Sequence, residues 1–244
     1  TRSKQILGTL TLVAVTAITL VVAPYTLLDP MALPKLTVLA FLAIVALSLI
    51  APALKSVYNS NYKILAILTA LFIFQVVLVM LFSGANITAQ FLGTYQRQTG
   101  GLTYVSLAIL MLSASLVSDS DFLKRFTRIT LVVGVILIVY GNLQYLGLEP
   151  FPYVNAYTLN APIGTFGNSN FQSAFMGLIA VVSFTMVLNK AFKSSIKIGL
   201  ALAGVASLIV VYETLSTQGY LNFIAGLGAV VIIWLFMTKR KTLG

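Results

Sequence analysis

The chain has 244 residues, of which 59% are hydrophobic and only 8% are charged, and its mean hydropathy is +1.01. Soluble domains carry about 25% charged residues, so this composition excludes a soluble monomer and indicates a membrane protein. The absence of His and Cys excludes Cys/His zinc sites, a Cys nucleophile, disulfides and an imidazole general base among these residues. The formal charge of +10 fits basic residues that flank membrane spans better than nucleic-acid binding.

Eight apolar runs follow one another along the chain, each close to the length of about 20 residues that a spanning helix needs. They are too continuous for the alternating strands of a transmembrane β-barrel. We therefore predict an all-α bundle of about eight spans, forming one transmembrane domain over 1–244. The first run is too long for a signal-peptide core, so we expect it to be retained, although a chain that starts at Thr1 implies processing or a leader. The runs cover residues 6–28, 36–54, 64–83, 102–118, 129–148, 170–189, 198–214 and 221–238.

The basic residues divide unequally between the two sides that these spans define. One side holds only Lys35 and Arg97. The positive-inside rule then places both ends of the segment in the cytoplasm. The other side holds thirteen basic residues: Arg2, Lys4, Lys55, Lys63, Lys124, Arg125, Arg128, Lys190, Lys193, Lys197, Lys239, Arg240 and Lys241.

The two longest external connections, 84–101 and 149–169, carry little charge and are rich in Gly, Asn, Thr, Tyr and Pro. In the first of them, Arg97 precedes the flexible pair Gly100 and Gly101. A guanidinium matches phosphate or carboxylate oxygens in a bidentate way, and glycines let backbone N–H groups approach an anion. The alternative is an interfacial Arg whose side chain reaches lipid headgroups.

The second connection ends in GTFGNSNF at 164–171, directly before the sixth run. Its two Gly, two Asn and one Ser favour a tight turn followed by a capped helix start. A helix N-terminus at the outer surface presents free N–H groups to an anionic ligand, and an ordinary turn and cap is the alternative. The candidate substrate-binding residues here are Gly164, Thr165, Asn168 and Asn170.

Glu213 ends the seventh run and precedes a short external turn. An ionisable residue beside a membrane span is a candidate functional residue, which here could accept a hydroxyl proton or pair with Arg97. A carboxylate that simply reaches solvent is the alternative. Ser216 and Gln218, in the same turn, are candidate substrate-binding residues.

The other polar residues have structural interpretations. We expect Asp29 to pair with Lys35 in the first external turn. Asp119 and Asp121 begin a basic cytoplasmic segment, where we expect solvated helix caps. The isolated Gln75, Asn142 and Gln144 are expected to connect helices by hydrogen bonds rather than to carry ions.

Three segments, in this order, resemble the O-antigen ligase/O-antigen polymerase superfamily of polytopic bacterial membrane glycosyltransferases. The element D-x-x-x-x-P-K is matched by Asp29 to Lys35. The pattern G-x-x-x-R-x-x-G-L-x-x-Y is matched by Gly93, Arg97, Gly100 and Tyr104, with one additional Gly that moves Leu to position 102.

The third and most specific pattern is G-T-F-G-N-x-N, matched by 164–170, in which Ser169 replaces the family's usual Pro. A weaker fourth element, S-x-R-G, is similar to 216–219. Gln218 stands at the family's Arg position there, so that position lacks the second phosphate-binding Arg.

The resemblance implies a GT-C-like enzyme of the bacterial inner membrane that needs no metal or other cofactor. Such an enzyme transfers a glycan from a polyprenyl-pyrophosphate carrier to a lipid, glycan or protein acceptor on the external face. Its Arg residues hold the pyrophosphate, which makes Arg97 a candidate catalytic residue. Glu213 is the second candidate, because it is the ionisable residue beside a span. Membrane lipid and the carrier-linked glycan are the expected partners, and no nucleic acid is expected. If they share one pyrophosphate, Arg97 and 164–170 should lie within roughly 10 Å of each other.

The family also uses a His in a large external loop further along the chain, and these 244 residues contain none. We therefore expect either the N-terminal part of a longer enzyme or a relative without the catalytic loop. The second possibility corresponds to a non-catalytic membrane scaffold or subunit that keeps the family fold. A small-solute transporter is a weaker interpretation, because paired charges at mid-membrane are absent from the spans.

Overall fold

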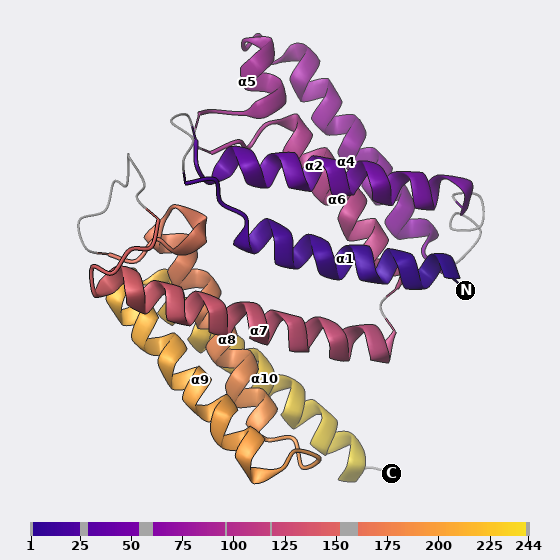
Figure 1. Cartoon of the computed structure of the whole chain (residues 1–244). Helices are drawn as coiled ribbons and strands as arrows, with labels where there is room; N and C mark the ends of the chain where they lie inside the picture. Colours follow the sequence, from indigo (N-terminus) through magenta and orange to yellow (C-terminus); the bar gives the residue numbers. More distant parts are fainter. Residues whose placement is uncertain are drawn as a thin grey trace. The chain divides into compact units, whose positions relative to one another are not determined.

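The computed structural model describes residues 2–24, 29–53, 61–95, 97–117, 119–151 and 161–242. Lys55 and positions 152–160 of the second long connection lie outside the described residues. All regular structure in the described ranges is helical, so the all-α prediction is confirmed for them. Figure 1 shows the helices, which are α1 (Arg2–Leu20), α2 (Ala32–Ile50), η1 (Ala51–Ala53), α4 (Lys63–Phe82), α5 (Ile87–Leu92), α6 (Gly101–Leu116), α7 (Ser120–Tyr145), η2 (Gly164–Phe166), α8 (Ser169–Val187), α9 (Ser194–Glu213) and α10 (Gln218–Thr242).

Six of the described helices are long and apolar enough to cross a membrane, namely α2, α4, α7, α8, α9 and α10. Two shorter apolar helices, Lys4–Leu20 and Gly101–Leu116, coincide with the first and fourth of the predicted runs. A helix satisfies its backbone N–H and C=O groups internally, which is why apolar runs in lipid become helices. The chain therefore has the character of a multi-pass membrane protein.

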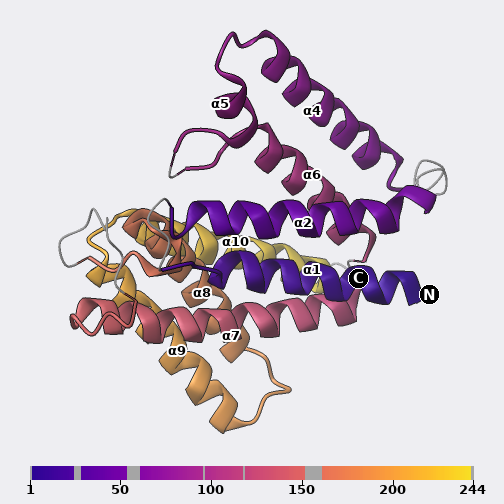
Figure 2. The same ribbon diagram turned by 45° about the horizontal axis from the view of Figure 1, so that its top comes forward.

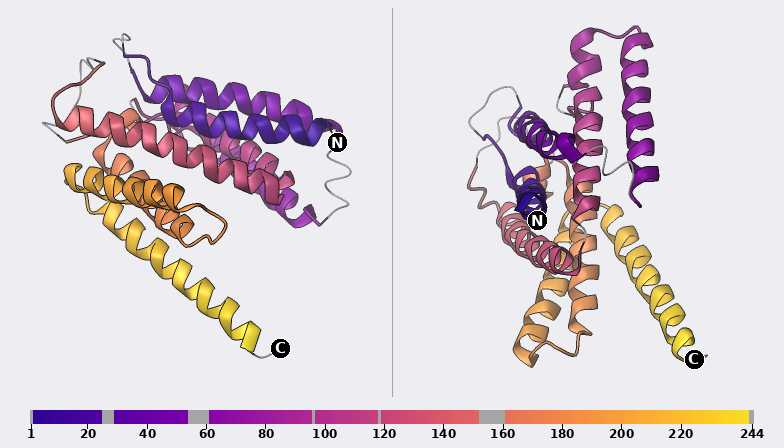
Figure 3. Two further views of the ribbon diagram at one scale, coloured as in Figure 1. Left: turned by 60° about the horizontal axis from the view of Figure 1, so that its bottom comes forward. Right: turned by 90° about the vertical axis from the view of Figure 1, so that its right-hand side faces the viewer.

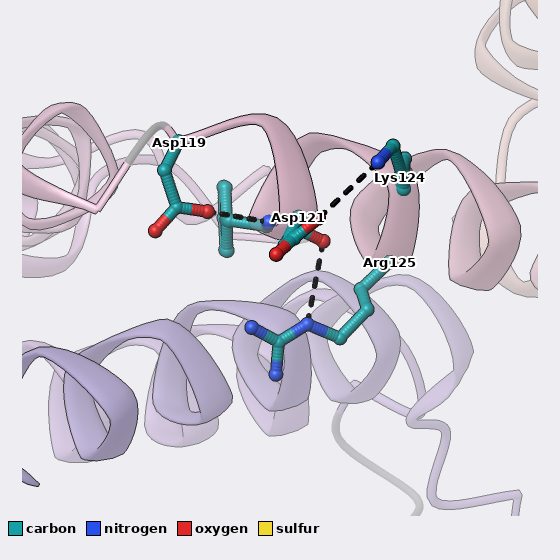
Figure 4. Close-up of polar contacts among 5 residues, drawn as sticks. Asp119, Asp121, Lys124 and Arg125 are labelled. Atoms are coloured by element: carbon teal, nitrogen blue, oxygen red, sulfur yellow. Dashed lines mark hydrogen bonds and ion pairs between the residues drawn. The ribbon is translucent and has the colours of Figure 1, made fainter.

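Helix α7 begins at Ser120, directly after the predicted cap residue Asp119 and before the apolar run at 129–148. Asp119 Oδ1 accepts a hydrogen bond from Phe122 N at 2.7 Å and so caps the helix (Figure 4). Asp121 forms an exposed ion pair with Lys124 at 3.2 Å. These contacts extend the helix into the polar segment that precedes the apolar run. The cap predicted at Asp119 is confirmed.

The described chain divides into two compact units, Thr1–Ile129 and Thr130–Gly244. The boundary falls within α7, so its first turns belong to the first unit. The prediction of a single transmembrane domain stays a prediction.

In the first unit, α1 and α2 lie side by side and pack with α6 (Figure 2). The buried side chains of this core come from one face of each helix and from the start of α7, where Phe122 packs beside the Cα of Gly8. α4 packs along α6 at the edge of the unit, as the right-hand view of Figure 3 shows. Typical members of the core are Leu10, Ala14, Leu39, Ala43, Ala46, Leu110 and Phe122.

The connection between α1 and α2 does not contain the predicted Asp29–Lys35 ion pair. Lys35 Nζ instead donates to Ile18 O at 2.8 Å and to Thr19 O at 2.9 Å, at the C-terminal end of α1. Asp29 Oδ1 accepts from Met31 N and Ala32 N at the start of α2. Each charge satisfies backbone groups at a helix end, where orphan N–H and C=O groups otherwise lack partners.

In the second unit, α8 is the central helix and packs against α9 and α10. The backbones of α8 and α10 come close where Gly177 faces Gly219, because a Cβ on Gly177 would collide with the carbonyl oxygen of Gly219. Gly134 of α7 leaves room for the side chain of Ile179, with which a Cβ would collide. Small residues at helix contacts are the usual way in which membrane helices reach dense packing. The most deeply buried apolar side chains of this unit are Val133, Leu137, Met176, Ile179, Val210 and Val211.

Candidate functional site

Arg97 lies in a loop whose two ends meet at Gly93 and Gly100. A Cβ on either glycine would collide with the backbone of the other, and Gly100 N donates to Leu92 O at 3.2 Å. Gly93 also has φ of +88°, a conformation that favours glycine. The two glycines of the G-x-x-x-R-x-x-G pattern are thus explained by loop closure.

The tip of this loop is a turn in which Arg97 N and Gln98 N both donate to Thr94 O at 3.0 Å. Arg97 is exposed, and no hydrogen bond or ion pair of its guanidinium is found among the residues that the structure describes. Gln98 is nearly buried with φ of +48°, and its Oε1 has no partner among them. The loop therefore presents a guanidinium whose donors are available to a ligand.

A cavity of about 390 Å³ lies beside the loop, between α4, α5 and α6. Thr99 and Gly100, which follow Arg97 closely in the chain, line it together with Ser83 at the end of α4 and Gln90 of α5. The rest of its wall is mainly apolar and comes from α4 and α6, including Phe72, Val76, Val79 and Met80. The cavity has the character expected for a molecule with an apolar chain and a polar end.

The 164–170 segment forms the predicted turn and cap. Gly164 and Gly167 have φ of +56° and +69°, so both glycines of the pattern take left-handed conformations. Asn168 is the N-cap of α8, and its Oδ1 accepts from Asn170 N at 2.8 Å. Thr165 is buried, whereas Asn168 and Asn170 are exposed. The turn leaves these two Asn side chains at the surface of the helix start.

Three residues outside the predicted site hold this turn. Gln144 Oε1 accepts from Ile163 N at 3.1 Å and from Gly164 N at 2.8 Å, and Gln144 Nε2 donates to Glu149 Oε2 at 2.6 Å. Tyr140 OH donates to Glu149 Oε1 at 2.7 Å. Gln144 thus connects the end of α7 to the turn, whereas the sequence predicts only that it links helices. The sequence signal that could have indicated this role of Gln144 is its position in the last turn of an apolar helix, five residues before Glu149.

The 216–219 turn lies against α8, in the same unit. Ser173 Oγ donates to Ser216 O at 3.2 Å and accepts from Gly219 N at 3.1 Å. Ser216 is buried, while Gln218 is exposed at the start of α10. Since Ser173 is one turn after the cap of α8, it brings the 164–170 and 216–219 segments to the same end of the helices.

Glu213 is buried at 7% exposure, where α9 ends. Its Oε2 has no hydrogen-bond partner among the described residues. Only this oxygen is enclosed, so the alternative of a carboxylate that reaches solvent stays open. A buried carboxylate oxygen without a partner is costly, which keeps Glu213 among the candidate functional residues.

The predicted site residues thus form two groups, one in each unit. Arg97 belongs to the first unit, and the 164–170 turn, Glu213 and the 216–219 turn belong to the second. A single pyrophosphate shared by Arg97 and 164–170, and a pair between Arg97 and Glu213, stay predictions. Comparisons with protein-family models, with curated proteins and with solved structures find no match for the chain.

Proposed function

We propose that the chain is the membrane part of a cell-envelope glycan ligase or polymerase. It transfers a glycan from a polyprenyl-pyrophosphate carrier to a lipid, glycan or protein acceptor on the external face. The observation that carries this proposal is the loop closed by Gly93 and Gly100, which carries the exposed Arg97 and contributes Thr99 and Gly100 to the wall of the cavity. The resemblance of its G-x-x-x-R-x-x-G pattern to the family supports the same conclusion.

The chemistry of the loop suits a pyrophosphate. A guanidinium offers several N–H donors in a fixed plane and makes charge-assisted hydrogen bonds to phosphate oxygens. The adjacent cavity supplies apolar walls for the first units of an isoprenoid chain and polar atoms of Ser83, Gln90 and Thr99 near the loop. The residues expected in roles at the reacting end are Arg97 and Glu213, with Gly164, Thr165, Asn168, Asn170, Ser216 and Gln218 binding substrate.

The same proposal includes eight spans, a GT-C-like fold, and cytoplasmic ends in the bacterial inner membrane. The two shorter apolar helices, α1 and α6, are then spans as well as the six longer ones. Within the second unit, the basic connection between α8 and α9 joins the helix ends that lie opposite Gly164 and Ser216. This separation of basic and candidate-site ends supports the orientation expected from the positive-inside rule.

The orientation is testable by labelling, because the chain has no Cys. Single Cys substitutions at Thr94 and Leu215 should react with a membrane-impermeant maleimide added outside the cell. Substitutions at Lys124 and Ser195 should react only after the membrane is opened. Equal labelling of both pairs in intact cells would contradict eight spans with cytoplasmic ends.

The function is tested with Arg97→Ala in protein reconstituted in lipid nanodiscs, with polyprenyl pyrophosphate as the probe. We expect at least a tenfold loss of affinity, because a charge-assisted contact contributes about 1.5–3 kcal/mol. Arg125→Ala is the matched control, since Arg125 is also exposed but donates its Nε to Asp121 O. Equal affinity in wild type and Arg97→Ala would overturn the proposal.

The alternative of a non-catalytic scaffold makes a different prediction for the same protein. A scaffold that keeps the fold binds the carrier without consuming the carrier-linked glycan. Membranes that contain the full-length protein should therefore be supplied with the carrier-linked glycan and an acceptor, and followed for transfer of the glycan and release of polyprenyl pyrophosphate. Release that depends on Arg97 supports the transferase, whereas binding without release supports the scaffold.

A further inference from the structure

The carboxylate of Glu149 accepts three hydrogen bonds just after the end of α7. Tyr140 OH and Phe151 N donate to Oε1, at 2.7 and 3.2 Å. Gln144 Nε2 donates to Oε2 at 2.6 Å. The carboxylate is thus occupied on both oxygens by donors from α7 and from its own loop.

This contact determines which way the amide of Gln144 points. A Gln amide has one accepting end and one donating end. Because the donating end faces a carboxylate, the accepting Oε1 faces the N–H groups of Ile163 and Gly164, at 3.1 and 2.8 Å. The reverse orientation would set the amide NH₂ against two further donors.

Within this turn, the Gln144 amide contacts the backbone N–H groups of Ile163 and Gly164. Gly164 has no side chain, and its φ of +56° needs to be maintained by its surroundings. On the other side, Gln172 Oε1 lies against Gly164, so closely that a Cβ there would collide with it. Gly164 is therefore seated between the amides of Gln144 and Gln172, and Gln144 supplies the acceptor for its backbone N–H.

We infer that Gln144 and Glu149 are positioning residues for the substrate-binding turn at 164–170. Glu149 orients the Gln144 amide, and Gln144 holds Ile163 and Gly164, which places Asn168 and the start of α8. That the turn binds substrate rests on the proposed function.

The hydrogen bonds that run from Glu149 through Gln144 to Ile163 and Gly164 form a relay of contacts. Each single substitution in this relay leaves two donors, or two acceptors, facing each other. Gln144→Glu sets a second carboxylate against Glu149, and two adjacent carboxylates cannot both stay ionised without repulsion. Glu149→Gln replaces one accepting oxygen with an NH₂ group, which then meets another donor in either orientation. Both single variants should loosen the turn.

The reciprocal double variant, Gln144→Glu with Glu149→Gln, should restore it. The carboxylate introduced at position 144 would accept from Ile163 N and Gly164 N with one oxygen, and from the NH₂ group introduced at position 149 with the other. The amide oxygen introduced at position 149 would still accept from Tyr140 OH and Phe151 N. The double variant thus keeps every hydrogen bond and the same net charge, with only the positions of acid and amide exchanged.

The test compares hydrogen–deuterium exchange of peptides covering 161–170 in nanodiscs, together with the affinity for polyprenyl pyrophosphate. We expect exchange about tenfold faster in each single variant, as loss of one to two hydrogen bonds implies, and near wild-type exchange in the double variant. Affinity should fall and recover in parallel. Asn142→Leu is the matched control, because Asn142 lies on the same helix and donates to Ile138 O within it.

The proposed relay would be wrong if the exchange rate of 161–170 were unchanged in the single variants. It would also be wrong if the double variant exchanged as fast as the single variants. Exchange that follows the pattern while affinity stays constant would overturn the positioning role. The proposed function is judged separately by Arg97→Ala, which leaves the relay intact. If that variant keeps its affinity while the exchange pattern holds, the transferase fails and the relay stands.

Discussion

Gly93 and Gly100 meet backbone to backbone at the base of the Arg97 loop, and a Cβ on either would enter the space of the other. The contact converts a stretch of polar sequence into a compact loop with the guanidinium at its tip. It also explains why glycine stands on both sides of Arg97. This contact and three others can be tested with matched controls inside the same chain.

Gly93→Ala should destabilise the first unit and weaken carrier binding. The new methyl group would meet the backbone of Thr99 and Gly100, in addition to the cost of the left-handed φ. We expect a loss of about 2–4 kcal/mol in the free energy of unfolding, measured by reversible unfolding in detergent. Gly84→Ala is the control, because Gly84 has φ of +67° but open space around it. Equal losses in the two variants would show that strain alone matters.

Ser173→Ala should destabilise the second unit by about 1–3 kcal/mol, because it leaves the buried Gly219 N–H without its acceptor. Ser207→Ala provides the comparison, since Ser207 is equally buried but donates only to Ala203 O in its own helix. Reversible unfolding in detergent should show a larger loss of unfolding free energy for Ser173→Ala than for Ser207→Ala. A smaller loss at Ser173 than at Ser207 would contradict a role in joining the 216–219 turn to α8.

Lys35→Met should destabilise the connection between α1 and α2. It keeps a flexible, unbranched side chain up to the Cε position but removes the donor to Ile18 O and Thr19 O. We expect a loss of about 1–3 kcal/mol, as for other hydrogen bonds from a charged group. Lys190→Met, at an exposed position, should change the unfolding free energy by less than about 0.5 kcal/mol. If an ion pair with Asp29 were the main contact of Lys35, Asp29→Asn would cause the larger part of the loss.

Asp119→Ala should cost about 1 kcal/mol by removing the cap of α7. Asp121→Ala removes only an exposed ion pair with Lys124, and such pairs contribute roughly 0–1 kcal/mol (Figure 4). Circular dichroism during thermal unfolding should rank the two variants in this order. A larger effect at Asp121 would indicate that the ion pair, rather than the cap, fixes the start of the helix.

The sequence by itself determined the class of the protein and the existence of its helices. In lipid, the backbone N–H and C=O groups of an apolar run can form hydrogen bonds only with each other. Each apolar run therefore predicts a helix from its composition alone. The same local logic predicted the cap at Asp119 and the turn at 164–170, since Asp, Asn and Gly act on neighbouring backbone. The apolar run at 129–148 marks only the later part of α7, because the polar first turns of that helix have no apolar signal.

The tertiary structure decided everything that depends on residues far apart in the chain. It showed that Lys35 binds the end of α1 rather than Asp29, and that Ser173 joins α8 to the 216–219 turn. It also showed that Gln144 orients Gly164 through a hydrogen bond spanning 20 positions in sequence. Tertiary packing determines which of many possible donors and acceptors come together in long-range pairs of this kind. The spacing of residues in the sequence does not indicate which pairs form.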